Sequence, residues 1–150
     1  MTSTVSNPPS AGLLRRLAAL LYDILLLFGL WTLTSALMLL VTGGWLAEPD
    51  RPNWLIITLQ ALLVLTTFGF FTWFWTHGGQ TLGMRAWRLQ LVGQNGAPVT
   101  VRQAVIRLVA AGLSLAPAGL GLWWVLIDPE QRAWHDRLSK TRLVVVPKNR

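Results

Sequence analysis

The chain has 150 residues, of which 53% are hydrophobic and only 13% are charged, and it carries a net charge of +7. Soluble domains normally contain about a quarter charged residues, so this deficit indicates a lipid environment, and the length allows one domain. The absence of cysteine excludes disulfides, thiolate metal sites and cysteine nucleophiles. The basic residues flank apolar runs, as in cytoplasmic loops of membrane proteins, which argues against nucleic-acid binding.

The N-terminal part of the chain predicts a disordered lead followed by a membrane span. We expect residues 1–12 to be disordered, since the segment Met1 to Ser10 is polar and contains two prolines. From Leu17 to Val41 the residues are almost all apolar, and a helix of this length would be about 37 Å long, enough to cross a core of about 30 Å. It lacks the short apolar region and small-residue exit of a cleaved signal peptide, so we expect this helix to remain.

A second span and a small hairpin are expected next. Residues 45–53 form a short polar turn, and Trp54 to Thr76 is again long and apolar. Residues 85–92 then alternate as in a strand, and the Asn95-Gly96 pair leads into residues 98–101. Because both turn residues tolerate positive φ, the pattern predicts a β-hairpin outside the membrane between these two segments.

The segment from Arg102 to Ile127 has two interpretations. Read as one helix, it is a third span; read as two, it is an amphipathic helix at 102–115 and a short apolar helix at 120–127, because Pro117 and two glycines interrupt it. A third span would place the basic tail after Asp128 outside the cell, whereas a re-entrant or interfacial pair keeps it inside. We therefore favour the pair.

The predicted fold class is an all-α membrane protein with two long transmembrane helices, this helical pair or a third span, and the small hairpin. The membrane domain should cover residues 13–146 and the tail residues 147–150, with both termini cytoplasmic. We expect a multi-pass protein of the inner (plasma) membrane, because the first loop carries acids while the flanks are basic.

Asp23 is the most informative polar residue, because an ionised carboxylate inside an apolar run costs about 2.5–3.5 kcal/mol on insertion scales. Arg16 lies seven residues away, too far for an ordinary helical ion pair, which needs a separation of about three or four residues. We therefore expect a cationic partner from another segment, with Arg107 the leading candidate. Asp23 would then belong either to an ion or ligand site or to a polar clasp that fixes helix packing.

The remaining polar groups do not predict catalysis. Acids, bases and His135 cluster between Asp128 and Arg137, but His135 next to Asp136 is a weak signal for a metal-dependent phosphohydrolase, since His77 is the only other histidine. The glycine-rich stretch 78–83 lacks the lysine and spacing of a phosphate loop. We expect no metal, no cofactor and no enzyme activity, since no nucleophile and base pair is present.

Several motifs together resemble the RDD family of membrane proteins, over Leu13 to Val146. They are an arginine that opens the first apolar helix, an aspartate within it, the Gly-Gln-Thr-Leu-Gly-Met-Arg stretch at 79–85 and the His-Asp-Arg-Leu-Ser-Lys-Thr stretch at 135–141, followed by two valines. This chain has methionine at 84 where the family often has lysine, and Ser-Lys before the threonine where Ala-Gly is usual.

The family is named for one arginine and two aspartates, and the resemblance assigns them to residues of this chain. The arginine falls on Arg16, with Arg15 as an alternative; the first aspartate falls on Asp23, and the second on Asp136, with Asp128 as a rival.

The resemblance implies a poorly defined function, with transport of an ion, proton or small ligand suggested. Because two spans cannot enclose a pathway alone, transport would need a homo-oligomer or a partner membrane protein in the bilayer. The alternative is a membrane-embedded accessory or scaffold protein whose polar residues are structural.

Overall fold

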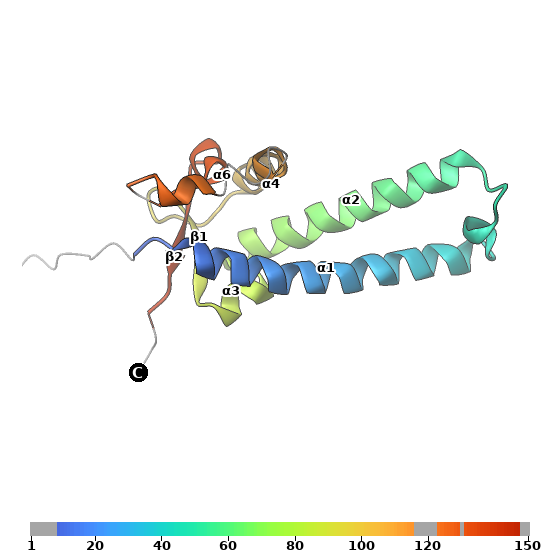
Figure 1. Ribbon diagram of the computed structural model, residues 1–150, viewed down its shortest axis with the longest axis horizontal. Coiled ribbons are helices and arrows are strands. Elements are labelled where there is room, and N and C mark those ends of the chain that lie inside the picture. Colours follow the sequence, from blue (N-terminus) through green and yellow to red (C-terminus); the bar gives the residue numbers. More distant parts are fainter. Residues whose placement is uncertain (1–8, 116–122, 130, 148–150) are drawn as a thin grey trace, which may run out of the picture.

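Two long antiparallel helices dominate the computed structural model, which describes residues 9–115, 123–129 and 131–147 (Figure 1). Helix α1 is Leu13–Val41, helix α2 is Asn53–Thr76, and the turn between them contains the short 3-10 helix η1, Trp45–Ala47. The other described elements gather at the opposite end from this turn (Figure 1). They are α3 (Leu82–Ala86), β1 (Leu89–Gly93), α4 (Val101–Leu115), η2 (Trp124–Leu126), α6 (Trp134–Leu138) and β2 (Thr141–Val145).

Helices α1 and α2 confirm the two predicted apolar helices, although α1 begins four residues earlier than the apolar run. Both are long and apolar enough to cross a membrane. A core helix of a soluble protein would bury most of its apolar window, but only 11% of the window is buried in each of these helices. Large side chains such as Leu25, Phe28 and Leu65 are exposed along their length. Such an apolar surface is compatible with lipid, because side chains that face the hydrocarbon core of a bilayer are predominantly apolar.

The β-hairpin expected around Asn95 is wrong. The turn forms, since Gly96 has φ +76° and the N–H of Gly93 donates to the carbonyl of Ala97 at 2.8 Å. However, β1 pairs antiparallel with β2, about fifty residues later, with Leu91 opposite Leu143. Pro98 has no N–H to donate to a strand ladder, whereas β2 supplies N–H groups and a buried leucine.

A capping box formed by Thr100 and Gln103, which was not predicted, starts helix α4 after the turn. The hydroxyl of Thr100 accepts from the N–H of Gln103 at 3.3 Å, and the side-chain oxygen of Gln103 accepts from the N–H of Thr100 at 3.1 Å. This reciprocal pair satisfies two N–H groups at a helix start, which favours a helix over a strand from Val101 onward.

The described length of α4 matches the predicted amphipathic helix. At 15 residues it is about 22 Å long, shorter than a bilayer core of about 30 Å. Residues 120–122 of the expected helix at 120–127 lie outside the described residues. The described remainder is helical at Trp123 and continues into η2.

The chain just before α1 is ordered, in contrast to the expected disordered lead. Ser10 forms a β-bridge with Val144, the N–H of Ala11 donates to the carbonyl of Leu143 at 2.9 Å, and Ala11 is fully buried. Residues 1–8 of the lead lie outside the described residues. The two ends of the described chain therefore meet at β2.

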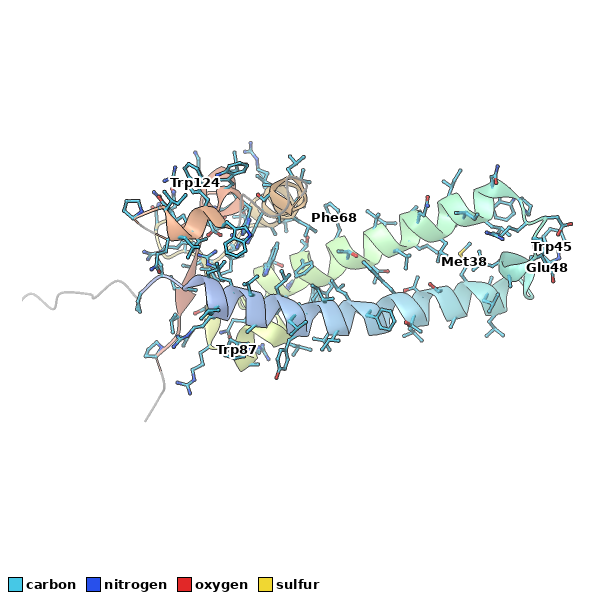
Figure 2. The ribbon with its side chains drawn as sticks, viewed as in Figure 1. Met38, Trp45, Glu48, Phe68, Trp87 and Trp124 are labelled. Atoms are coloured by element: carbon cyan, nitrogen blue, oxygen red, sulfur yellow. The ribbon has the colours of Figure 1, made fainter. Side chains whose placement is uncertain are left out.

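The hydrophobic core sits at this end of the molecule rather than between the far halves of the long helices. Its buried members come from both long helices and from α3, β1, α4 and β2, including Ala19 of α1, Trp75 of α2, Met84 of α3, Leu89 of β1 and Leu143 of β2. In Figure 2, Phe68 lies toward this end, whereas Met38, Trp45 and Glu48 lie near the opposite turn. Polar side chains that enter this core are positioned by elements distant in sequence.

Candidate functional site

Asp136 is the centre of a buried ion cluster. It belongs to α6, and its side chain is fully buried. One carboxylate oxygen accepts from Nη1 of Arg16 at 2.7 Å, and the other accepts from Nη1 of Arg107 at 2.5 Å. The N–H of Ala133 also donates to it at 3.0 Å. One carboxylate thereby ties together the start of α1, the middle of α4 and α6.

All three side-chain nitrogens of Arg16 donate hydrogen bonds to protein acceptors. Besides Asp136, its Nε donates to the carbonyl of Ala11 at 2.8 Å and its Nη2 donates to the carbonyl of Gln131 at 2.9 Å. Both carbonyls belong to irregular segments, which leave such groups free for side-chain donors. Each guanidinium nitrogen of Arg16 thus has an acceptor within the protein, so this side chain holds neighbouring segments together as well as carrying a charge.

Arg107 is bound through one nitrogen only. Its Nη1 donates to Asp136 and, at 2.8 Å, to the hydroxyl of Thr141. The guanidinium carbon lies 5.4 Å from the centre of the Trp75 ring, within the range of a cation–π contact. Among the described residues, its Nε and Nη2 have no hydrogen-bond acceptor.

Asp23 is held by uncharged donors, so the expected cationic partner is wrong. One oxygen accepts from the hydroxyl of Thr81 at 2.6 Å, and the other accepts from the N–H of Gly83 at 3.0 Å. Arg107, the leading candidate, binds Asp136 instead. The prediction assumed that a buried carboxylate needs a cation as its partner. Here two hydrogen bonds, one from Gly83 of α3 and one from Thr81 at the N-cap of α3, compensate for the burial of Asp23.

The glycine at 83 explains how α3 reaches Asp23. A Cβ atom at this position would lie 2.3 Å from the carbonyl oxygen of Ala19 and 2.8 Å from an Asp23 oxygen. Only glycine lets the backbone of α3 approach α1 so closely. The Gly-Gln-Thr-Leu-Gly stretch, taken from sequence as a tight loop, therefore supplies the binding partner of Asp23.

Asp128 lies apart from the Asp136 cluster. It accepts from the N–H of Arg132 at 2.8 Å, from Nε of Arg132 at 3.4 Å, and from Nη2 of Arg137. These partners are four and nine residues away in sequence, so Asp128 organises the turn that leads to α6. It is the one predicted site residue that the fold does not bring to the others.

Burial and the two arginines set the charge states of α6. Burial alone would raise the pKa of Asp136, but the charges of Arg107 and Arg16 outweigh it and hold the pKa below its usual value. Burial, with the nearby charge of Arg107, lowers the pKa of His135 to about 3. At neutral pH Asp136 is therefore ionised and His135 is neutral.

A cavity of about 400 Å³ lies beside these groups. Arg16, Asp23, Arg107 and His135 line it. The rest of its wall is mainly apolar and comes from α1, α2, α3, α4 and β2: Ala19, Leu20, Phe68, Phe71, Trp75, Met84, Leu108, Ala111 and Leu143. Within the described residues no group of three or more histidines or acids could hold a metal ion. The chemistry available is therefore charge, hydrogen bonding and apolar contact.

Comparison with known families gives one decisive result, because the RDD family model matches residues 10–140, most of the chain. The chain belongs to the RDD family. No curated protein and no solved structure matches it. In this RDD protein Arg16 and Asp136 pair directly, and Asp23 lines the same cavity as Arg16. The alternative arginine, Arg15, is exposed.

Several residues of the site were not predicted from sequence. Thr81 and Gly83 bind Asp23, Thr141 binds Arg107, and Trp75 packs beside it. Thr81 could have been identified as a helix cap, because threonine is favoured directly before the first residue of a helix. Its hydroxyl accepts from the N–H of Met84, three residues later, at 3.1 Å. Thr141 and Trp75 carry no local signal, because long-range packing alone brings them to Arg107.

Proposed function

We propose that this RDD protein is a transport-related membrane protein that binds an ion, a proton or a small ligand in the cavity beside Arg16, Asp23 and Arg107. The observation that supports it most is the cavity itself, which buried charged groups line at one end of two apolar helices. Charged groups in such positions are costly, and they usually mark ligand or ion pathways in membrane proteins.

The two aspartates suit different roles. Asp136 neutralises Arg16 and Arg107, so a change in its charge would unbalance two buried cations. Asp23 has only neutral donors, a hydroxyl and a peptide N–H, so it can bind and release a proton or cation without breaking an ion pair. We therefore assign the exchanging role to Asp23 and the structural role to Asp136.

The protein would work as an oligomer, or with a partner membrane protein, in the inner (plasma) membrane with both termini in the cytoplasm. Two spans cannot surround a pathway, so a second copy would have to complete it. The contact between the residues before α1 and β2 supports termini on one side. The basic residues of the tail support the cytoplasmic side.

Asp23→Asn tests this proposal, because it keeps the shape of the side chain and removes its charge. Pure protein in liposomes should lose proton- or ion-coupled flux, while insertion and thermal stability change little. Asp50→Asn is the matched control, since Asp50 is exposed in the turn between α1 and α2. Flux that persists in Asp23→Asn would remove Asp23 from the mechanism.

An accessory or scaffold role is the second candidate, and a separate observation favours it. The carboxylates of Asp23, Asp128 and Asp136 all have protein partners already, as expected of structural clasps. If wild-type protein gives no flux and Asp23→Asn lowers stability, the scaffold role is favoured over transport.

A further inference from the structure

We propose that the cavity takes an amphiphilic oxyanion, a molecule with a carboxylate or phosphate group and an apolar chain, as its ligand. This inference rests on the proposed role of the cavity as a ligand site and names the chemical class of that ligand. Three features of the cavity wall carry it: an excess positive charge, nitrogen atoms without partners among the described residues, and a wall that is otherwise mainly apolar.

The ion cluster around Asp136 has one more positive charge than negative charges. Arg16 and Arg107 contribute two positive charges, Asp136 contributes one negative charge, and His135 is neutral. Asp23 does not complete the balance, since it lies about 10 Å along α1 from Arg16 and is bound by Thr81 and Gly83. A buried excess charge is unfavourable, and an anion placed beside Arg107 would remove it.

Arg107 has the correct edge available for such an anion. Its Nη1 is used by Asp136 and Thr141, while Nε and Nη2 lack acceptors among the described residues. The N–H groups of Nε and Nη2 form one edge of the guanidinium fork, which binds carboxylate or phosphate oxygens in pairs. Arg107 is only 5% exposed, so most of its side chain is shielded from solvent.

Two further buried groups of the cavity wall lack partners. Nε1 of Trp75 and Nδ1 of His135 have no hydrogen-bond partner within the described structure, and both residues are more than nine-tenths buried. Both line the cavity together with Arg107. An unpaired buried polar group is rare and needs an explanation, and a bound oxyanion would accept from the indole N–H of Trp75.

The remaining wall indicates why the anion should carry an apolar chain. Trp75 is one residue from the end of α2, whereas Phe68 lies seven residues, about 10 Å, farther along the helix from that end. Phe71 and Leu20 also line the cavity, whose wall is mainly apolar although Asp23 and Thr67 belong to it. A free inorganic anion would fill only the Arg107 end, while a fatty-acid or lipid-like molecule matches both ends.

Binding can be measured by native mass spectrometry of the full chain in a neutral maltoside detergent. The probes are dodecanoate and dodecyl phosphate, with dodecanol as the uncharged analogue and acetate and inorganic phosphate as anions without a chain. We expect one bound dodecanoate or dodecyl phosphate, and binding at least tenfold weaker for the other three. Equal binding of acetate or phosphate would overturn the amphiphile, and equal binding of dodecanol would overturn the anion site.

Three variants test the location of the ligand. Arg107→Lys keeps the charge beside Asp136 and removes the fork edge, and Trp75→Phe keeps the ring and removes the N–H; each should weaken binding about tenfold or more. Gly112→Leu should block binding, because Gly112 lines the cavity and an added Cβ meets no atom within 4 Å. Gly29→Leu is the matched control, because Gly29 is equally open but lies away from the cavity.

The outcomes separate this inference from the proposed function. Binding of dodecanoate that survives Gly112→Leu and Trp75→Phe would overturn the inference even if Arg107→Lys fails to fold. Absence of dodecanoate and dodecyl phosphate binding to the wild-type chain would also overturn it, whether or not Asp23-dependent flux is observed. Conversely, binding that depends on Gly112 and Trp75 supports the ligand class even if the liposomes show no flux.

Discussion

At the scale of single residues, each buried charge is compensated by a different kind of partner. Asp136 is compensated by two guanidinium groups, Asp23 by a hydroxyl and a peptide N–H, and Asp128 by a local turn with Arg137. His135 needs no charged partner, because it is neutral at neutral pH. These differences determine how each residue should respond to mutation and pH.

The stability of the protein should depend on pH through His135. Its pKa is lowered to about 3 in the folded protein, mainly by burial, from about 6.5 in the unfolded chain. Between these values the unfolded chain binds more protons, so stability is complete above pH 6.5 and falls as the pH drops. We expect a slope of up to about 1.4 kcal/mol per pH unit between pH 5 and 6, measured by thermal or denaturant unfolding in detergent.

His135→Gln should remove most of this slope, because glutamine does not titrate. The control is His77→Gln, which should keep it, since His77 is exposed and stacks on Trp73. Carboxylates add to the pH dependence only at lower pH, because Asp136 has a lowered pKa and loses its stabilising contribution below about pH 3.8. A slope that is unchanged in His135→Gln would contradict the buried, neutral state of this histidine.

At the scale of elements, close backbone approach and long-range pairing fix the short segments. Helix α3 has only five residues and could not persist alone, so its contact with α1 must hold it in place. Likewise, β1 is stabilised by a strand that arrives from the C-terminal tail.

Gly83→Ala should displace α3 from α1. The new Cβ would lie 2.3 Å from the backbone oxygen of Ala19, which cannot rotate away as a side chain could. We expect a loss of about 1–3 kcal/mol in the free energy of unfolding, as for overpacked cores. Gly29→Ala in α1, where an added Cβ meets nothing within 4 Å, should leave stability unchanged or slightly raised. Equal stability of Gly83→Ala and wild type would mean that α3 does not approach α1 in this way.

A designed disulfide can distinguish the observed sheet from the expected hairpin. Val92 pairs with Arg142, and Cα atoms in antiparallel pairs lie about 4.5–5.5 Å apart, within the range of a disulfide. Because the chain has no cysteine, Val92→Cys with Arg142→Cys should give one unambiguous cross-link under mild oxidation, detected by mass spectrometry. A two-residue turn at Asn95 and Gly96 would place Val92 opposite Val99 in a local hairpin, and Val92→Cys with Val99→Cys should not cross-link.

At the scale of the whole molecule, the buried charged residues of the described chain lie at one end of an apolar helical pair. The opposite end holds a short turn with Glu48 (Figure 2), and Asp50 belongs to the same turn. This asymmetry suits a protein that presents its cavity and sheet to one side of a membrane and only a turn to the other.

Reporter fusions test the orientation of the whole chain. A reporter inserted at Asp50 and one fused after Arg150 should report opposite compartments, with the latter in the cytoplasm, because basic residues concentrate in the tail. An antibody or protease protection assay on the same fusions gives an independent reading. Both reporters on the same side would rule out two spans followed by a cytoplasmic tail.

Features that depend on local composition could be predicted from the sequence. The two apolar helices, the amphipathic α4 and the cost of burying Asp23 follow from hydropathy, periodicity and the free energy of a charge in lipid. Arg16 and Asp136 were singled out through the family resemblance. The family resemblance follows from the same residues, and the match over residues 10–140 confirms it.

Which of these groups contact one another could be seen only in the folded protein. From sequence, Asp23 and Arg107 formed the natural pair, yet Arg107 binds Asp136 and Asp23 binds α3. Likewise, the turn at Asn95 indicated a local hairpin, yet β1 pairs with β2. The physical reason is the same in both cases: several partners satisfy the same carboxylate or strand edge equally well. The choice among them depends on the packing of segments that are 29 to 60 residues apart in sequence, which no local pattern encodes.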